Sequence, residues 1–463
     1  MSIFRSLSKA LQCLFCIVYF LPSTLFAQDD APARLIRPNE QFDIHFSQLS
    51  RLESLEGQYR LAHNGSSDQV LIYRSAVEGR YTHGVAQLNV ELLDVRQAFA
   101  DEGTPLTRRS VEAANLQQLY LTWNWPKVFS SSKVDVNLGR QTLNLGSRRL
   151  LSRSTSNVPV SFTGVVANLQ REKGERWTAF SLVPVLSFPS ARADILDNRA
   201  ERNKESHGTR FVGVFVQLPE HRFGLQSEYY AFHLREVDTG DEELADLSIN
   251  TVGTHLYTPV APGKMDYELE AALQAGKSRA SAAPSDLLDL RHRAYFYHLS
   301  FGYSPDVALT PHVQLLYDFA SGDRNPSDKE NNRFDTLFGA RRSEFGPSSL
   351  YGPFYRANLS TLGLRLTVNP SPALEMIFTL RDFALASSRD EWGKSGWQDS
   401  SGRSGRDLGR HLETRMRWDA IPGNLAVDTG MVWLQTGDFP SEVSFKHTPS
   451  LSRYAYLQTS LSF

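Results

Sequence analysis

The strongest constraint in this sequence is an alternation of apolar and polar residues with a period of two, repeated along most of the chain. Leu119, Leu121 and Trp123 alternate with polar neighbours, and the segment from Tyr295 to Tyr303 follows the same pattern. A period of two is that of a β-strand with two different faces. After residue 27, no apolar stretch is long enough for a membrane-spanning helix. The chain is therefore predicted to be an all-β protein.

Segments of this kind number about eighteen, and the connections between them alternate between short and long. The short connections are rich in Pro and Gly, as tight turns are. Short periplasmic turns and long extracellular loops are typical of an outer-membrane barrel, so we predict a transmembrane antiparallel β-barrel of about 18 strands over residues 41–463. The predicted strands begin near Phe42, Leu71, Val85, Leu116, Val134, Pro159, Arg176, Arg210, Gly224, Ile249, Met265, His292, Pro311, Phe354, Leu374, His411, Leu425 and Leu451.

The first 27 residues predict a signal peptide, because Arg5 and Lys9 precede an apolar run that Pro22 ends. Residues 28–40 are expected to form a short periplasmic segment. Both cysteines, Cys13 and Cys16, lie in the apolar run, so the exported chain would contain no thiol and no disulfide. We therefore expect a location in the bacterial outer membrane.

The charges are balanced, with 49 Lys and Arg residues against 51 Asp and Glu residues. Such a balance offers no excess basic surface for nucleic acid, so no nucleic-acid partner is expected. An aromatic content of 11% is too high for a disordered chain.

Strand alternation also sorts the charged residues by face. In a membrane barrel the apolar set contacts lipid, and the opposite set lines the water-filled interior. Charged pairs inside a barrel can act as structural braces, or arginines can attract an anion while interleaved acids keep its binding weak. The residues assigned to the interior by strand parity are Arg74, Glu78, Arg80, Glu91, Glu268, Glu270, Asp318, Arg365, Glu375, Arg381, Glu413, Arg415, Arg417 and Asp428.

The segment from Leu138 to Leu151 interrupts the alternation, and Gly139 suggests a β-bulge there. A bulge would turn Arg140 into the lumen and leave Arg148 and Arg149 at the outer rim; the alternative is a strand end with solvated arginines. Adding Arg140, the predicted pore-lining residues are Arg74, Arg140, Asp318, Arg365, Arg381, Arg415, Arg417 and Asp428.

The longest loop begins near Tyr317 and is dense in Asp, Asn and Gly. Its acidic residues could bind calcium, but no calcium-loop spacing is present, so we expect no metal and no cofactor. Phe334, Leu337 and Phe338 indicate instead that the loop packs against the protein, where it could constrict the pore.

These features resemble the alginate-export family of bacterial outer-membrane proteins. The resemblance rests on the LGRQ stretch from Leu138, the SGD and FDTLFG elements between Ser321 and Gly339, and the final aromatic strand ending at Phe463. Family members often have Pro where Thr336 stands. The resemblance implies an eighteen-stranded barrel with an arginine-rich lumen that conducts the polyuronate alginate outward, and it supports the lumenal role most directly for Arg140, Asp318 and Arg365.

Several functions stay open on sequence grounds. The chain could instead be a porin for uptake of small anionic solutes, or a structural or adhesin barrel. A barrel enzyme would need a nucleophile and a base, and the best pairing is His298 or His233 with Ser300; no nucleophile motif surrounds Ser300, so we expect no enzyme. The expected partners are an anionic polysaccharide or oligosaccharide, outer-membrane lipid and, for an exporter, a periplasmic scaffold. A closed barrel satisfies its own edges, so a monomer is expected.

Overall fold

The computed structural model describes residues 36–39, 41–63, 65–128, 132–153, 157–220, 224–240, 242–283, 285–340, 342–444 and 448–463. The predicted signal peptide and most of the predicted segment 28–40 lie outside these ranges. Within them, no helix is both long and apolar enough to cross a membrane.

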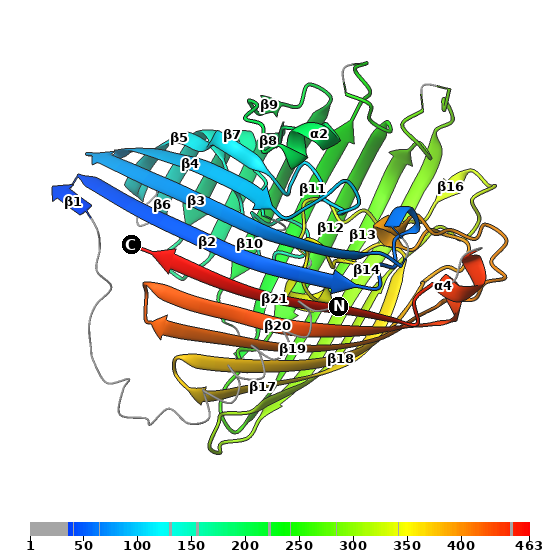
Figure 1. The fold of residues 1–463 in the computed structure, drawn as a ribbon. Coiled ribbons are helices and arrows are strands. Elements are labelled where there is room, and N and C mark those ends of the chain that lie inside the picture. The colour runs from blue at the N-terminus through cyan, green and yellow to red at the C-terminus, as the bar shows by residue number, and fades with distance from the viewer. Residues whose placement is uncertain are drawn as a thin grey trace.

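Eighteen long strands form one closed antiparallel barrel (Figure 1). Each strand pairs with its neighbours in the chain, and the last strand pairs with the first long one. The strands of the wall are β2 (Phe42–Glu56), β3 (Ser67–His83), β4 (Ala86–Ala98), β5 (Glu112–Val128), β6 (Ser132–Gln141), β7 (Phe162–Gln170), β8 (Arg176–Leu186), β10 (Thr209–Leu218), β11 (Gln226–Glu236), β12 (Leu247–Tyr257), β13 (Lys264–Ser278), β14 (Leu290–Ser304), β15 (His312–Ala320), β17 (Leu359–Ser371), β18 (Leu374–Ala384), β19 (Asp407–Ile421), β20 (Leu425–Thr436) and β21 (Leu451–Ser462).

The remaining elements are short. Three small strands pair at the ends of the wall, and the few helices lie in the loops. They are β1 (Ile36–Asn39), β9 (Lys204–Glu205), β16 (Glu330–Asn331), α2 (Arg192–Leu196), α3 (Arg342–Phe345), α4 (Asp438–Val443), η2 (Leu61–His63) and η4 (Gly393–Ser395).

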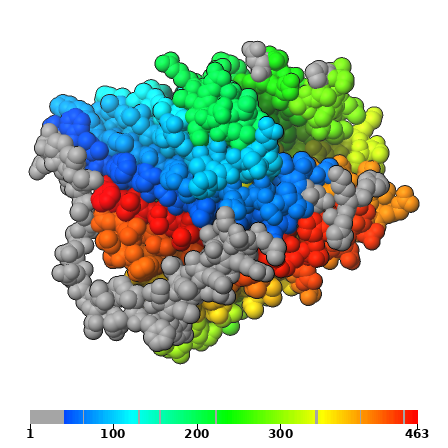
Figure 2. All heavy atoms as spheres, viewed as in Figure 1, coloured from blue at the N-terminus to red at the C-terminus, as the bar shows by residue number. Residues whose placement is uncertain are grey.

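Closure of the barrel depends on the two ends of the described chain. β21 pairs with β20 on one side and with β2 on the other. The Phe463 amide donates to the Phe46 carbonyl at 2.9 Å, and the Phe46 amide donates back at 3.1 Å. Figure 2 shows the N-terminal and C-terminal strands side by side on the surface. The terminal aromatic residue therefore completes the seam of the wall.

The eighteen predicted strands all correspond to observed ones, and short turns alternate with long loops as predicted. The predicted starts differ from the observed ones by a few residues, and Phe354 lies furthest from its strand. Phe354 does not begin a strand, because it lies in the loop before β17 and its ring stacks on Phe383 at a centroid distance of 3.6 Å. The alternation there reflects aromatic packing inside the barrel.

The outer face carries the exposed apolar side chains. Leu364 is 52% exposed, and its two cross-strand neighbours, Leu315 and Leu380, are 52% and 50% exposed. The opposite face of the same strands carries Arg365 and Arg381, which therefore point into the barrel. The predicted division into an apolar exterior and a polar interior is confirmed.

The interior is filled in part by two long loops, which we call the first inner loop (residues 142–161) and the second inner loop (residues 321–358). The first inner loop follows β6, and the second follows β15. Buried aromatic residues of the second inner loop pack against inward side chains of the wall: Phe334 is 1% exposed and contacts Phe296 at a ring distance of 5.5 Å. The expected packing of this loop is confirmed.

The apolar belt gives a stability prediction. Replacing Leu364 with Arg places a charge in the middle of the lipid-facing surface, which costs about 2–4 kcal/mol of unfolding free energy. Leu364→Phe, which keeps an apolar side chain, is expected to cost less than about 1 kcal/mol. Urea unfolding of the barrel in lipid vesicles measures both. Equal stability of the two variants would contradict the lipid-facing assignment.

Candidate functional site

The inward face of β17, β18 and β19 carries an arginine at each of four successive levels. Cross-strand register places Arg417 level with Glu375 and Asp428, nearest the short turns. Arg415, Arg365 and Arg381 occupy the next three levels toward the loops. Because two residues of a strand span about 7 Å, the four guanidinium groups form a staircase along the wall.

Each of these arginines has a polar partner. Arg417 lies 3.2 Å from Glu375, and Arg415 donates to Asp428 at 2.9 Å. Arg381 donates to Asp318 at 2.8 Å, and the Arg365 Nε donates to the Thr379 hydroxyl at 3.2 Å.

The exposure of the staircase falls from the turns toward the loops. The side chain of Arg417 is 54% exposed, that of Arg415 is 13% exposed, and that of Arg381 is 1% exposed. The arginines are therefore open to solvent at the turn end of the barrel and covered at the loop end.

Arg74 faces inward from β3, on the other side of the seam between β2 and β21. It stands opposite Leu49 on β2 and Val95 on β4. Among the described residues, no hydrogen bond or ion pair of its guanidinium is observed. Seven of the eight predicted pore residues thus occupy inward positions; they are Arg74, Asp318, Arg365, Arg381, Arg415, Arg417 and Asp428.

Arg140 is the exception, and the predicted bulge at Gly139 is wrong. The pairing of β5 with β6 runs without a shift from Leu138 to Arg140, which stands opposite the exposed, outward-facing Leu119. Arg140 donates to Glu205 of β9 at 2.6 Å. The unbroken register requires glycine at position 139, since its φ is +131° and a Cβ would lie 2.4 Å from the Leu119 carbonyl oxygen. Arg140 therefore belongs to a cluster at the loop-side rim.

Arg149 is buried inside the barrel, so its predicted place at the outer rim is also wrong. It donates to Glu268 and to Glu270, the latter at 2.8 Å, from the first inner loop to the wall strand β13. It also contacts Glu344 of the second inner loop. Sequence alternation could not reveal this, because the position follows from how the loop folds back.

The two inner loops pair with each other through their backbones. The Phe338 amide donates to the Leu150 carbonyl at 3.0 Å, and the Ser152 amide donates to the Phe338 carbonyl at 3.0 Å. Leu151 and Phe338 form a parallel β-bridge. Arg356 adds contacts to the backbone of the first inner loop and to Glu344. These contacts join residues 148–152 and 338–340 into a short parallel ribbon inside the barrel, which we call the inner ribbon.

Beside Arg149, five adjacent wall strands carry a row of alternating acids and histidines. In register order from β11 to β15, the row is Glu228, His255, Glu270, His298 and Asp318. We call these five residues the acid–histidine row. The sequence predicts inward positions for Glu270 and Asp318. The two histidines are absent from that prediction, although they share the inward parity of their strands.

His255 lies between two carboxylates. Its Nδ1 is 2.8 Å from Glu228, and its Nε2 is 2.8 Å from Glu268. An imidazole that contacts a carboxylate at both nitrogens donates through both, which requires the cationic form. His298 contacts Asp318 at 2.7 Å and lies 3.7 Å from Glu268.

Acidic and basic groups contact one another along this wall. Five carboxylates, counting Glu268 and Glu344 with the row, meet three arginines and the two histidines. These contacts matter because an unpaired charge in a buried site is very costly.

The same contacts, together with burial, shift the pKa values of the arginines in the two inner loops. Burial alone would lower the pKa of Arg149, but Glu268 and Glu270 outweigh this and hold its pKa above the ordinary value. Burial lowers the pKa of Arg356 to about 9, and the charge of Arg149 acts in the same direction.

The residues weighed for enzymatic chemistry do not assemble. His233 faces outward from β11, hydrogen-bonded to Asn250 at 3.0 Å, whereas Ser300 faces inward on β14. Ser300 accepts a hydrogen bond from Gln314 at 3.3 Å, and His298 binds Asp318. In the part of the chain that the structure describes, no group of three His, Cys, Asp or Glu residues is placed to hold a metal ion.

The sequence matches one known family. The model of the alginate export family matches residues 48–447. Comparison with curated proteins gives no match.

Solved structures of outer-membrane porins share the fold at low sequence identity. The BenF-like porin of Pseudomonas fluorescens Pf-5 superposes with a TM-score of 0.58 at 11% identity, covering 92% of this chain and 99% of that one. OccD3 (OpdP) of Pseudomonas aeruginosa gives 0.57 at 10% identity, covering 92% and 91%. OccAB1 of Acinetobacter baumannii gives 0.56 at 12% identity, covering 91% and 96%. These similarities concern the fold.

The contacts of Arg149 predict what holds the inner ribbon. Arg149→Gln leaves three carboxylates without their common cation, which costs about 3 kcal/mol or more of local stability. Amide exchange of residues 148–152 and 338–340 should then rise about a hundredfold. Arg148→Gln is the matched control, because this neighbouring side chain is exposed. Hydrogen exchange with mass spectrometry measures both, and unchanged exchange in Arg149→Gln would contradict this role.

Proposed function

The chain belongs to the alginate export family, and on that premise we propose that this outer-membrane channel conducts an alginate-like polyuronate by passive transport. The observation that carries the proposal is the staircase of Arg417, Arg415, Arg365 and Arg381 along one inner wall. Arginine keeps its charge and binds a carboxylate through two parallel hydrogen bonds. A polymer with a carboxylate on every sugar could therefore pass from one level to the next.

The acids beside the staircase favour weak binding of the polymer, as transport requires, over tight binding. Arg417 is paired with Glu375, and Arg415 is paired with Asp428. A solute carboxylate must compete with these partners, so each arginine attracts the polymer but holds it weakly. Weak, repeated binding is what conduction through a selective pore requires.

The inner ribbon acts, in this proposal, as the gate of the channel. It lies at the loop end, where Arg381 is covered, and it is held by charged side chains that an incoming polyanion could compete for. Displacing the two inner loops from the wall would expose the upper end of the staircase. Binding shifts the population only if the polymer binds the open state more tightly. Arg381 and Arg149, once exposed, would give the open state this higher affinity.

Uptake of small anionic solutes is the second candidate. The covered state of Arg381 favours it, because the ribbon leaves less room at the loop end for a polymer than for a small solute. The similarity in fold to solved porins is compatible with either direction of transport.

Charge reversal in the staircase tests the channel. Arg365→Glu should lower the anion-to-cation permeability ratio by a factor of about three or more, because it reverses a charge that lines the path. The same change should weaken block by uronate oligomers about tenfold. Arg365→Lys, which keeps the charge, should retain the selectivity. Reversal potentials in planar bilayers measure these ratios, and a pore indifferent to both changes would overturn the proposal.

Locking the ribbon tests the gate. The bridge between Leu151 and Phe338 brings two backbones close enough for a disulfide, so Leu151→Cys with Phe338→Cys should join the inner loops under oxidation. We expect the oxidised channel to exclude uronate polymers and the reduced channel to pass them. Passage of small anions but never of polymers, in either state, would favour the uptake porin.

A further inference from the structure

The outer wall carries a row of positive charges just beyond its apolar belt on the loop side. Five neighbouring strands, β10 to β14, place Arg210, Arg235, Ser248, Lys277 and Arg291 directly opposite one another. Arg210, Arg235, Lys277 and Arg291 are exposed and point outward. Adjacent strands lie about 4.8 Å apart, so the row spans about 19 Å. We call these four cations, together with Arg293, the basic row. Arg293 lies one level nearer the middle of the wall.

Like charges stand next to each other in this row. Arg210 is opposite Arg235, and Lys277 is opposite Arg291. Like charges at directly paired positions destabilise a sheet, so an anion bound between them would stabilise this part of the wall. Lys277 has Asp289 at 3.3 Å and Arg291 has Glu330 at 3.6 Å. Within the described residues, the guanidinium groups of Arg210, Arg235 and Arg293 have no ion pair or hydrogen bond.

Outward arginines elsewhere on the wall are paired individually. On β4, Arg96 binds Asp94 at 3.0 Å, and on β19, Arg410 binds Asp382 at 2.9 Å. On β21, Arg453 lies 3.3 Å from Glu56. The unpaired cations are therefore a property of this side of the barrel and not of the whole loop-side rim.

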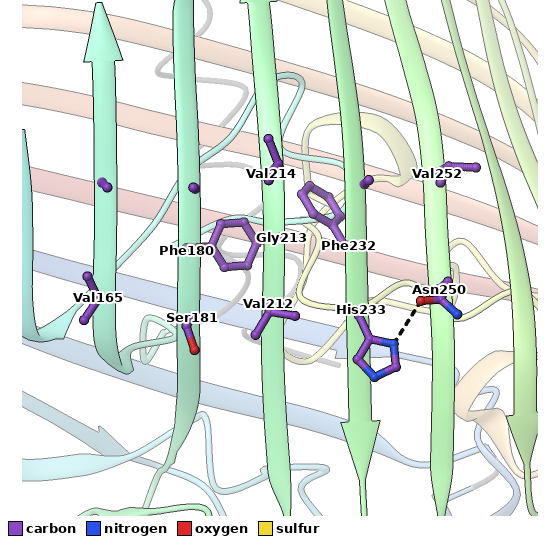
Figure 3. Close-up of a pocket in the computed structure, with 13 residues that line it drawn as sticks. Val165, Phe180, Ser181, Val212, Gly213, Val214, Phe232, His233, Asn250 and Val252 are labelled. Carbon is purple, nitrogen blue, oxygen red and sulfur yellow. Dashed lines mark hydrogen bonds between the residues drawn. The ribbon is translucent and has the colours of Figure 1, made fainter. Parts of the chain in front are cut away.

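An apolar hollow of about 600 Å³ lies on the outer wall, nearer its middle than the basic row. Figure 3 shows the residues that line it. Its floor is a row of small outward side chains, Ala167, Ala179, Val214, Ala231 and Val252, which pair across five strands. Val212, His233 and Asn250 form the level between this floor and Arg235. Arg235 lies four residues along β11 from Ala231, so the floor and the basic row are about 13 Å apart.

We propose that this surface binds one lipid with a phosphorylated headgroup from the leaflet on the loop side. Phosphate oxygens accept hydrogen bonds from Arg210, Arg235 and Arg293, and the acyl chains run along the wall into the small-residue hollow. The order of the two parts matches that of a lipid, with charge at the membrane surface and hydrocarbon toward its middle. Guanidinium groups suit this role, since their planar donors match phosphate geometry.

Retention of lipid by the purified protein tests the proposal. Wild-type protein purified from outer membranes is compared with the double variant Arg210→Gln/Arg235→Gln. Each is exposed to a rough lipopolysaccharide or to phosphatidylcholine, and native mass spectrometry measures the lipid that stays bound. The wild type should retain the phosphorylated lipid, and the double variant should retain about tenfold less. Arg96→Gln/Arg410→Gln, which removes two paired outward arginines, is the control and should behave as wild type.

Two further measurements separate a specific site from a general lipid coat. Ala231→Phe fills the hollow without altering charge, so it should reduce retention of the phosphorylated lipid while heat-dependent gel mobility shows a folded barrel. The same lipid with its phosphates removed should bind as weakly as phosphatidylcholine. Equal retention by wild type and both variants, equal retention of all lipids, or a dimer formed through this face would each overturn the proposal.

Discussion

Pairing of every backbone amide and carbonyl is the constraint on which this structure depends. A sheet within lipid cannot leave an edge exposed, because no water is present to satisfy it. Here the requirement is met by joining β2 to β21, with Phe463 and Phe46 exchanging hydrogen bonds at the end of the seam. Once the wall is closed, strand alternation assigns each side chain to lipid or to the lumen, and the positions of the arginines follow.

At the loop end of the barrel, the charged side chains are buried. Arg149 and Arg381 are almost completely removed from solvent; Arg149 contacts three carboxylates of the wall and the second inner loop, and Arg381 pairs with Asp318. Isolated charges at such positions would be very unfavourable, and mutual pairing makes them tolerable. The same pairing connects the inner loops to five wall strands through the acid–histidine row. The contacts that hold the inner loops against the wall are therefore the same contacts that pair the buried charges.

Alternation predicted the barrel and its inward charges well, because the period of two is a local property that closure preserves. Arg365 and Asp318 are inside for the same reason that Leu364 and Tyr317 are outside. It failed where the chain leaves the wall. Arg149 and Phe354 take their positions from long-range folding of the inner loops, and their sequence neighbours carry no sign of the partners they meet. At Gly139, the change in phase predicts a bulge, whereas in the structure the glycine adopts a positive φ within an unbroken register.

The ribbon between the inner loops has a mechanical consequence. Its two halves come from the β6–β7 connection and the β15–β17 connection, which start from different parts of the circumference. A barrel wall resists stretching along its hydrogen bonds but can flatten toward an oval, and a link between loops that start at different strands opposes such flattening. The cross-section near the loops should therefore stay closer to its resting shape than the cross-section at the turn end. Releasing this link would make the loop-side rim more compliant.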